Sequence, residues 1–377
     1  MGQVESEIKV LVVNPGSTST RVAIYHGRDQ VYTDNIQHPA RELAAFPCIS
    51  DQLEYRKSAV AESLASSGYT ASDFDAVVSR GGAVRPVSGG VYKIDEAVID
   101  DVTHRPSTEH AANLGAVIAA DIARTAGISA FLVDPISVDE FEPLARLSGL
   151  PELPRVSLLH ALSIRATAKK AAERLDRKVA DINVIVAHMG GGITVCPVKR
   201  GRMIDANGAN DEGPLSPERS GSIAAKDLAE ICFSGKYTER ELIFRLTHAS
   251  GLVAHLGTSD ARTIEEMIES GDAHASLVVQ AMCCQIAKEI GAMATVLSGD
   301  VDAIALTGGL AAWDRVVSDL TARCRFISQI LVFPGENEME ALALGALGAL
   351  LGTEEVKSYA AEAGKCQGEP GRRNGLC

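Results

Sequence analysis

Residues 9–27 read KVLVVNPGSTSTRVAIYHG. The first run, Lys9–Asn14, is apolar and β-branched and ends in a Pro-Gly-Ser turn. A second apolar run follows at Arg21–Tyr25, and a third near Val31–Ile36 after a turn at His26–Asp29. Short runs of this kind between small turn residues predict a meander of strands.

The pattern returns at midchain, where residues 183–201 read NVIVAHMGGGITVCPVKRG. Strands are predicted at Asn183–Ala187 and Ile193–Val198, and a third begins at Arg202–Asp205. The spacing from Gly16 to Gly27 equals the spacing from Gly190 to Gly201. A repeated strand and turn unit with matched spacing predicts a duplicated domain.

Helical patterns alternate with these strands. Apolar residues with helical spacing predict helices at Ala111–Ala126, His160–Leu175 and Ala275–Leu297, the last leading into a buried strand at Val301–Thr307. Thr263 and Glu266 fit a capping box at the start of a helix over Ile264–Ile268. A chain of 377 residues with 4% aromatics and alternating elements predicts an α/β protein of two domains.

Charge and composition exclude several classes. The net charge is −13 and no dense Lys/Arg run occurs, which argues against a nucleic-acid or anionic-membrane partner. Neither a leader nor an apolar run of about 18 residues is present, so no membrane segment is predicted. The 8 cysteines lack metal-ligand spacing, which predicts reduced thiols and a cytoplasmic protein.

Three glycine-rich turns carry the candidate chemistry. Gly16 is followed by Ser17, Thr18 and Ser19, which offer backbone N–H and hydroxyl donors to a polyanion, and Arg21 adds charge from the next strand. The second turn is Gly190, Gly191 and Gly192, and the third is Gly308 and Gly309. Because these residues have no side chains, a ligand can approach their backbone. Each turn alone also fits an ordinary hairpin or flexible loop.

The order of the three turns is typical of the ATPase fold shared by acetate kinase, sugar kinases, Hsp70 and actin. Rival nucleotide-binding motifs fail on inspection. Gly235-Lys236 is followed by Tyr237 and lacks the upstream glycine of a P-loop, and no G-x-G-x-x-G opens a helix.

Longer segments extend the resemblance over about residues 8–350. They include VVSRGGAVRPVSGGVY, VDPISVDEFEPLARLSGLPE, HALSIRATAKKAA, GPLSPERSGS, LGTSDAR and FPGENEMEALALGAL, and they closely resemble the butyrate kinases within the wider family of acetate and butyrate kinases. The resemblance implies two duplicated ribonuclease H-like, actin-type ATPase domains with an interdomain active-site cleft. We expect them at 8–155 plus about 341–363 and at 156–340, before a disordered tail at 364–377.

The same resemblance implies roles for individual residues. Asn14 and Ser17 would lie near the phosphates and Mg²⁺, and Asp134 would lie near the acid and Mg²⁺. Arg219 resembles the arginine that stabilises the transferring phosphoryl group. The remaining candidates are two histidines of the active site, His160 and His188, and an acidic residue that serves Mg²⁺, either Glu338 or Glu340.

Two positions depart from acetate kinases. Acetate kinases carry an arginine a few residues before the Gly-Gly of the VVSRGGAV region, whereas Arg80 here directly precedes Gly81-Gly82, so its role in binding the carboxylate is a hypothesis. The residue before the His160 position is aromatic in acetate kinases and is Leu159 here. A smaller side chain leaves room for a longer acyl tail, which predicts a preference for acids of four or five carbons.

The predicted reaction is reversible, direct in-line phosphorylation of butyrate or a branched acid by ATP, giving ADP and an acyl phosphate. A carboxylate is already ionised at neutral pH and needs no general base, so Mg²⁺, arginines and backbone donors suffice. The alternatives are a propionate or acetate kinase, an ATPase switch of the actin or Hsp70 type, and a non-catalytic relative. The resemblance also implies a homo-oligomer.

Overall fold

The computed structural model describes residues 2–105, 110–210, 212–335 and 337–363, so the predicted disordered tail lies outside the described residues. The chain divides into two compact units. Unit 1 comprises residues 1–139, 150–154 and 337–377, and unit 2 comprises residues 140–149 and 155–336.

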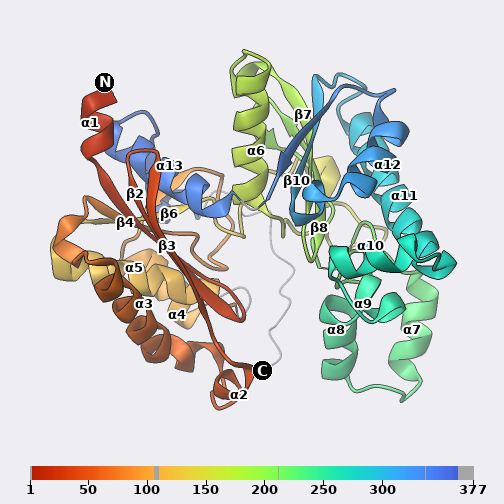
Figure 1. Ribbon diagram of the computed structural model, residues 1–377, viewed down its shortest axis with the longest axis horizontal. Helices are drawn as coiled ribbons and strands as arrows, with labels where there is room; N and C mark the ends of the chain where they lie inside the picture. The colour runs from red at the N-terminus through yellow and green to blue at the C-terminus, as the bar shows by residue number, and fades with distance from the viewer. Residues whose placement is uncertain (1, 106–109, 211, 336, 364–377) are drawn as a thin grey trace. The chain divides into compact units, whose positions relative to one another are not determined.

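Unit 1 is built on a sheet of seven strands in the order β12-β5-β6-β4-β1-β2-β3 (Figure 1). The strands β1, β4 and β6 run parallel, while β1, β2 and β3 form the predicted antiparallel meander. Their bounds are β1 Lys9–Pro15, β2 Ser19–His26, β3 Asp29–Gln37, β4 Ala76–Ser79, β5 Val91–Lys93, β6 Ser129–Val133 and β12 Val356–Lys357.

The helices of unit 1 are α1 Gly2–Glu7, α2 Ala40–Leu43, α3 Leu53–Ser67, α4 Glu96–His104, α5 Ala112–Ala126, α13 Glu338–Leu351 and α14 Tyr359–Glu362. Both α5 and α13 pack against β1, β4 and β6. Small residues permit the close approach, since a Cβ at Gly345 would lie 2.9 Å from Val133 Cγ1. As a result, α13 begins beside the ends of the parallel strands.

Unit 2 has a sheet of five strands in the order β11-β10-β7-β8-β9, with β7 Asn183–Met189, β8 Ile193–Lys199, β9 Arg202–Met203, β10 Ala303–Gly308 and β11 Ile330–Pro334. This order and its strand directions match β6-β4-β1-β2-β3 of unit 1. The predicted duplication is therefore confirmed. The third predicted strand of this unit begins as expected at Arg202, and β9 ends at Met203; Asp205 beyond it pairs with Arg155.

The helices of unit 2 are α6 Ala161–Arg174, α7 Ala225–Phe233, α8 Glu239–His248, α9 Gly251–Leu256, α10 Ala261–Glu269, α11 Ala273–Val296 and α12 Asp314–Cys324. The helix α11 packs against β7, β8 and α12 (Figure 1). Its residues Met282, Ile286 and Ile290 belong to the hydrophobic core of the unit. Within the described residues α11 alone is long and apolar enough to cross a membrane, and 44% of its most apolar window is buried.

The predicted capping box of α10 is wrong. The helix begins at Ala261, two residues before Thr263, and its N-cap is Asp260. The Asp260 carboxylate accepts hydrogen bonds from Thr263 N at 2.9 Å and Thr263 Oγ1 at 3.1 Å. Aspartate is among the strongest N-cap residues because its carboxylate satisfies a bare N–H and complements the helix dipole. Thr263 therefore lies inside the first turn.

Candidate active site

Three predicted site residues follow three parallel strands of unit 1. Asn14 lies at the end of β1, Arg80 directly follows β4, and Asp134 directly follows β6. Val13 pairs with Ser79, and Ser79 pairs with Leu132. The carboxyl ends of parallel strands meet at one edge of a sheet, which is where ligands of open α/β sheets bind. The fold thus brings these three residues to one edge.

Glu338, the first residue of α13, lies at the same edge. Its Oε2 accepts a hydrogen bond from Asn14 Nδ2 at 3.1 Å, and its Oε1 lies 3.0 Å from Arg80 Nη1. Glu340 instead influences Tyr25 through its charge. Burial raises the pKa of Tyr25 to about 12, and the negative charge of Glu340 is the second cause. Of the two candidate acidic residues, the geometry joins Glu338 to the other site residues.

Asp134 is held in a backbone conformation that side chains rarely adopt. Its φ is 39° and its side chain is 4% exposed. Gly90 N–H donates to Asp134 Oδ1 at 2.8 Å, and Asp134 N–H donates to Gly90 O at 3.1 Å. Such strain persists only where surrounding contacts impose it, and it concentrates at functional sites.

The predicted phosphate turn is closed by a hydrogen bond from Gly16 N–H to Ser19 O at 2.8 Å. Ser17 and Thr18 are exposed between the two strands. Arg21, on β2, is the register partner of Asn14 on β1. The turn is therefore continuous with the sheet edge that carries Asn14.

The glycine turns of unit 2 also lie at the ends of parallel strands. Thr307 on β10 pairs with His188 on β7, so Gly308 and Gly190 follow at neighbouring strand ends. A Cβ at Gly308, where φ is 90°, would lie 2.5 Å from Met189 O. Only glycine permits this approach of two backbones.

A cavity of about 660 Å³ opens beside these turns, within unit 2. Its size is that of a small-molecule site. Trp313 is among the residues that line it, and its Nε1 donates to Glu265 Oε2 at 2.7 Å. Three of the predicted glycines line the cavity, Gly190, Gly191 and Gly309. Its other lining residues include four charged and two apolar side chains: Glu218, Asp260, Arg262 and Glu265, then Leu310 and Trp313.

Arg219 lies across the second glycine turn. A Cβ at Gly192 would collide with its guanidinium, and Arg219 Nη1 donates to Ala209 O at 2.6 Å. Ser216 Oγ donates to Gly191 O at 2.7 Å and accepts from Arg219 N at 3.1 Å. Glycine at 192 is thus required for Arg219 to occupy its place.

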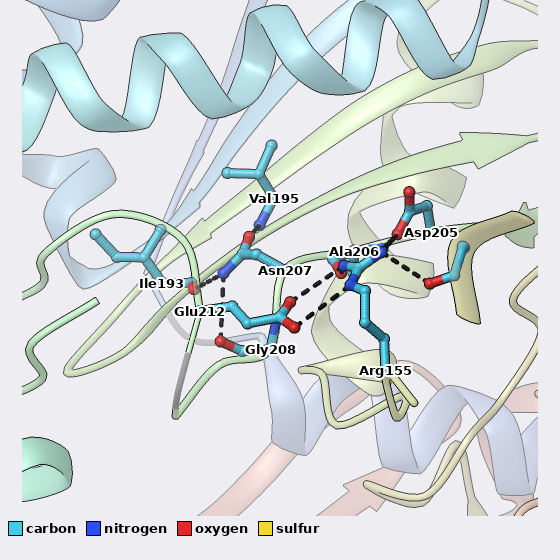
Figure 2. A network of polar contacts seen from close by, with 9 residues as sticks. Arg155, Ile193, Val195, Asp205, Ala206, Asn207, Gly208 and Glu212 are labelled. Carbon is cyan, nitrogen blue, oxygen red and sulfur yellow. Dashed lines mark hydrogen bonds and ion pairs between the residues drawn. The ribbon is translucent and has the colours of Figure 1, made fainter. Parts of the chain in front are cut away.

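The loop that supplies Ala209 is anchored by Arg155, as Figure 2 shows. Arg155 binds Asp205 Oδ1 at 2.9 Å, Ala206 O at 2.6 Å and Glu212 Oε2 at 3.1 Å. Figure 2 also shows Asn207, whose amide accepts from Val195 N at 2.7 Å and donates to Ile193 O at 2.8 Å. Asn207 thus ties the loop to β8 before Ala209, and Glu212 ties it to Arg155 after Ala209.

The two predicted histidines are stacked, with ring centroids 4.1 Å apart and planes inclined by 22°. His160 Nδ1 lies 2.9 Å from Thr194 Oγ1, and His188 Nδ1 lies 2.8 Å from Ser163 Oγ. Each ring orientation is thereby fixed by a hydroxyl, and the two rings form a single layer. The hydroxyl partners were not predicted.

Sequence reasoning missed other residues at these sites, among them Arg56, Arg155, Glu265 and Trp313. The missed arginines lie in helix and loop stretches with no local motif. Only the position of Trp313, four residues after Gly309, offered a signal.

Known proteins resemble this chain along its length. The acetokinase family pattern matches residues 155–328. Butyrate kinase 2 of Clostridium acetobutylicum is 45% identical over 355 residues, which are 94% of this chain and 99% of that protein. Both findings confirm the predicted family.

Solved structures agree on the fold. The acetate kinase of Porphyromonas gingivalis matches with a TM-score of 0.74 at 20% identity, covering 91% of this chain and 100% of that one. A propionate kinase of Francisella tularensis matches with a TM-score of 0.69 at 17% identity, covering 90% and 98%. The predicted α/β fold of duplicated actin-type ATPase domains is confirmed.

Proposed function

This chain belongs to the acetokinase family, and from that premise we propose that it transfers the γ-phosphoryl group of ATP to a short-chain fatty acid. The observation that carries the proposal is the likeness to a butyrate kinase over 94% of the chain, together with the meeting of Asn14, Arg80 and Glu338 at one sheet edge. A carboxylate oxygen attacks the γ-phosphorus while the bond to the oxygen bridging to ADP breaks. The products are an acyl phosphate and ADP.

We assign the nucleoside to the cavity of unit 2. The glycines at 190, 191 and 309 carry no side chain, and Trp313, which also lines the cavity, is an aromatic partner for a purine. We assign the phosphates to the Gly16–Ser19 turn of unit 1. The guanidinium of Arg219 lies over Gly192 and would stabilise charge on the phosphoryl group in flight.

Mg²⁺ suits the donors of unit 1. Glu338 and Asp134 offer carboxylate oxygens, and Asn14 offers an amide oxygen, the ligands that Mg²⁺ prefers. The described residues contain no group of three or more His, Cys, Asp or Glu placed to hold a metal. Few protein ligands suit an ion that also keeps waters and nucleotide phosphates. The ion, when bound, neutralises charge on the β- and γ-phosphates.

The acid requires a cation near the attacking oxygen and an apolar site for its tail. Arg80 is the candidate cation, since its side chain lies at the sheet edge with Glu338 and Asn14. Leu159 is buried at 4% exposure directly before His160. We propose that this leucine, in place of the aromatic residue of acetate kinases, favours butyrate or a branched acid of four or five carbons over acetate.

We further propose a homo-oligomer in the cytoplasm. The six described cysteines are free thiols, as expected in a reducing compartment. Light scattering of the purified protein checks the assembly, since a monomer would contradict it.

Hydroxylamine trapping tests the proposed function. The purified chain is incubated with Mg-ATP, hydroxylamine and a panel of acids from formate to hexanoate with branched isomers. We expect hydroxamate from butyrate or isobutyrate well above that from acetate. Acetate as the best substrate would overturn the acid assignment alone, and no hydroxamate from any acid would overturn the reaction.

A further inference from the structure

Arg56 on α3 is a fully buried cation, with 0% of the residue exposed. Its Nε donates to Gln52 Oε1 at 3.0 Å. Its Nη1 donates to Gly16 O at 2.9 Å, to Ser19 O at 3.2 Å and to Thr20 Oγ1 at 3.1 Å, and its Nη2 donates to Ser17 O at 3.1 Å. One buried side chain therefore donates hydrogen bonds to four oxygens in and directly after the phosphate turn.

All of these partners are neutral. In the part of the chain that the structure describes, no Asp or Glu carboxylate lies within ion-pair distance of Arg56. Arg155 and Arg85, by contrast, each pair with a carboxylate. Burying a guanidinium without a counter-charge is costly, so a fully buried and unneutralised arginine calls for an explanation beyond packing.

The contacts also divide the polar groups of the turn into acceptors that are hydrogen-bonded and donors that are not. The carbonyls of Gly16, Ser17 and Ser19 are held by Arg56, and the carbonyl of Thr18 accepts from His38 N at 2.8 Å. The N–H and hydroxyl groups of Ser17 and Thr18 make no hydrogen bond to another described residue. The protein thus occupies the acceptors of the turn and leaves its donors available to an anion.

His38 and Tyr55 extend the hydrogen-bond network around Arg56 and Thr20. Thr20 Oγ1 contacts both Arg56 Nη1 and His38 Nε2, the latter at 2.8 Å, and His38 Nδ1 lies 3.3 Å from Tyr55 OH. Burial lowers the pKa of His38, as does the nearby charge of Arg56, and Glu42 opposes them more weakly. The lowered pKa favours the uncharged form of His38, which leaves Arg56 as the cation beside Thr20 and the turn.

We propose that Arg56 is a positioning residue for the nucleotide phosphates: it holds the carbonyls of the Gly16–Ser19 turn inward and its buried charge is balanced by the phosphates that the turn binds. The inference rests on the proposed function for the identity of the anion. It assigns Arg56 no direct contact with substrate. The turn can thus bind a polyanion with a single cation placed out of reach of solvent.

The test compares Arg56→Gln and Arg56→Lys with Lys57→Gln. Lys57 is the next residue of α3, pairs with Asp121 at 2.8 Å and is not among the residues that contact the turn, so its variant controls for loss of one positive charge. Arg56→Lys keeps a buried cation but cannot reach all four oxygens. It serves as the folded variant if Arg56→Gln fails to fold.

We expect Arg56→Gln to raise KM for ATP by about tenfold or more, the usual effect of losing charge-assisted hydrogen bonds, with KM for the acid unchanged. Arg56→Lys should give a smaller rise, and Lys57→Gln none. The thermal shift caused by ATP should shrink in the same order. Equal changes of both KM values, or an undiminished ATP shift in both Arg56 variants, would overturn the proposal.

The thermal shift also separates this inference from the reaction itself. If the wild-type chain forms no hydroxamate but is stabilised by ATP, the shift in the variants still decides the role of Arg56. A wild-type chain that ATP and inorganic phosphate do not stabilise would refute the anion site.

Discussion

Asn14 Nδ2 donates a hydrogen bond to Glu338 Oε2 at 3.1 Å, although the two residues stand 324 positions apart. The other carboxylate oxygen of Glu338 pairs with Arg80. The first strand of unit 1 and its long C-terminal helix α13 therefore complete one polar cluster. A carboxylate held by an amide and a guanidinium has a fixed orientation, as binding of a metal–nucleotide complex requires.

Replacing Glu338 should harm catalysis more than replacing Glu340. Glu338→Gln removes a buried carboxylate beside Asn14 and Arg80, and we expect kcat to fall by about 100-fold with a raised Mg²⁺ requirement. Glu340→Gln is the matched control, two residues along the same helix, and should change kcat by less than about threefold. Titrating Mg²⁺ at saturating ATP measures both effects, and equal losses would contradict the assignment.

Arg155 should affect the position of Arg219 through the loop that carries Ala209. Arg155→Met removes the bonds to Asp205 and Glu212 (Figure 2). The Ala209 carbonyl that accepts from Arg219 is then no longer fixed. We expect kcat to drop by about tenfold or more, as for a misplaced charge, while KM for ATP changes little. Arg155→Lys should recover only part of the rate, since an ammonium cannot bind Glu212 through two N–H groups in the fixed geometry of a guanidinium while also binding Asp205. A rise in KM for ATP with normal kcat would argue against this path.

Trp313 is the one tryptophan of the chain, so its fluorescence reports on the unit 2 cavity alone. ATP or ADP should change the emission intensity with saturation, because the base replaces water next to the indole. Butyrate alone should leave the emission unchanged. Glu265→Gln, which weakens the hydrogen bond to Trp313 Nε1, should lower nucleotide affinity several-fold. Saturable ATP binding that leaves the emission unaltered would place the nucleoside elsewhere.

The corrected cap of α10 predicts unequal stability losses. Asp260→Ala removes the acceptor of two hydrogen bonds and should lower the free energy of unfolding by about 1 kcal/mol. Thr263→Ala leaves the cap carboxylate in place and should cost about half of that or less. Urea unfolding without nucleotide compares the two, and a larger loss for Thr263→Ala would restore the capping box predicted from sequence.

Glu289 on α11 should make stability depend on pH. Burial is the main cause of its raised pKa, and the charge of Glu212 adds to it. A carboxyl whose pKa is higher in the folded state favours folding below its unfolded pKa, and this contribution is lost as pH rises through the folded value. Glu289→Gln should therefore raise Tm relative to wild type at pH 8, with the gain fading toward pH 5. An equal change in Tm at both pH values would contradict this origin.

The sequence predicted the fold well in the two repeated segments of strands and glycine turns. The two strand meanders, their glycine turns and the duplication are local patterns, and the sheet topology reproduces them. Asn14 adjoins a strand that the sequence predicts, whereas Arg80 and Asp134 were candidates only through the family resemblance, because the strands before them, β4 and β6, were not predicted. That Glu338 lies beside Asn14 could be seen only in the structure, because Glu338 and Glu340 point in directions about 200° apart around the helix axis.

Residues that act by supporting others could not be predicted. Arg56 lies in a helix with no motif around it, and its contacts with Gly16 and Ser17 are 40 and 39 positions away in sequence. The error at α10 had a similar cause. Thr263 and Glu266 match a capping box, but Asp260 three residues earlier competes for the same N–H.

A kinase of this family transfers the phosphoryl group to a carboxylate and not to water. Phosphorus NMR of the purified chain with Mg-ATP and butyrate follows the γ-phosphate directly. We expect the γ-phosphate signal to be replaced by an acyl phosphate signal in equal amount with ADP, and no change when butyrate is omitted. Release of ADP with inorganic phosphate, independent of butyrate and without acyl phosphate, would contradict the account and favour an ATPase switch.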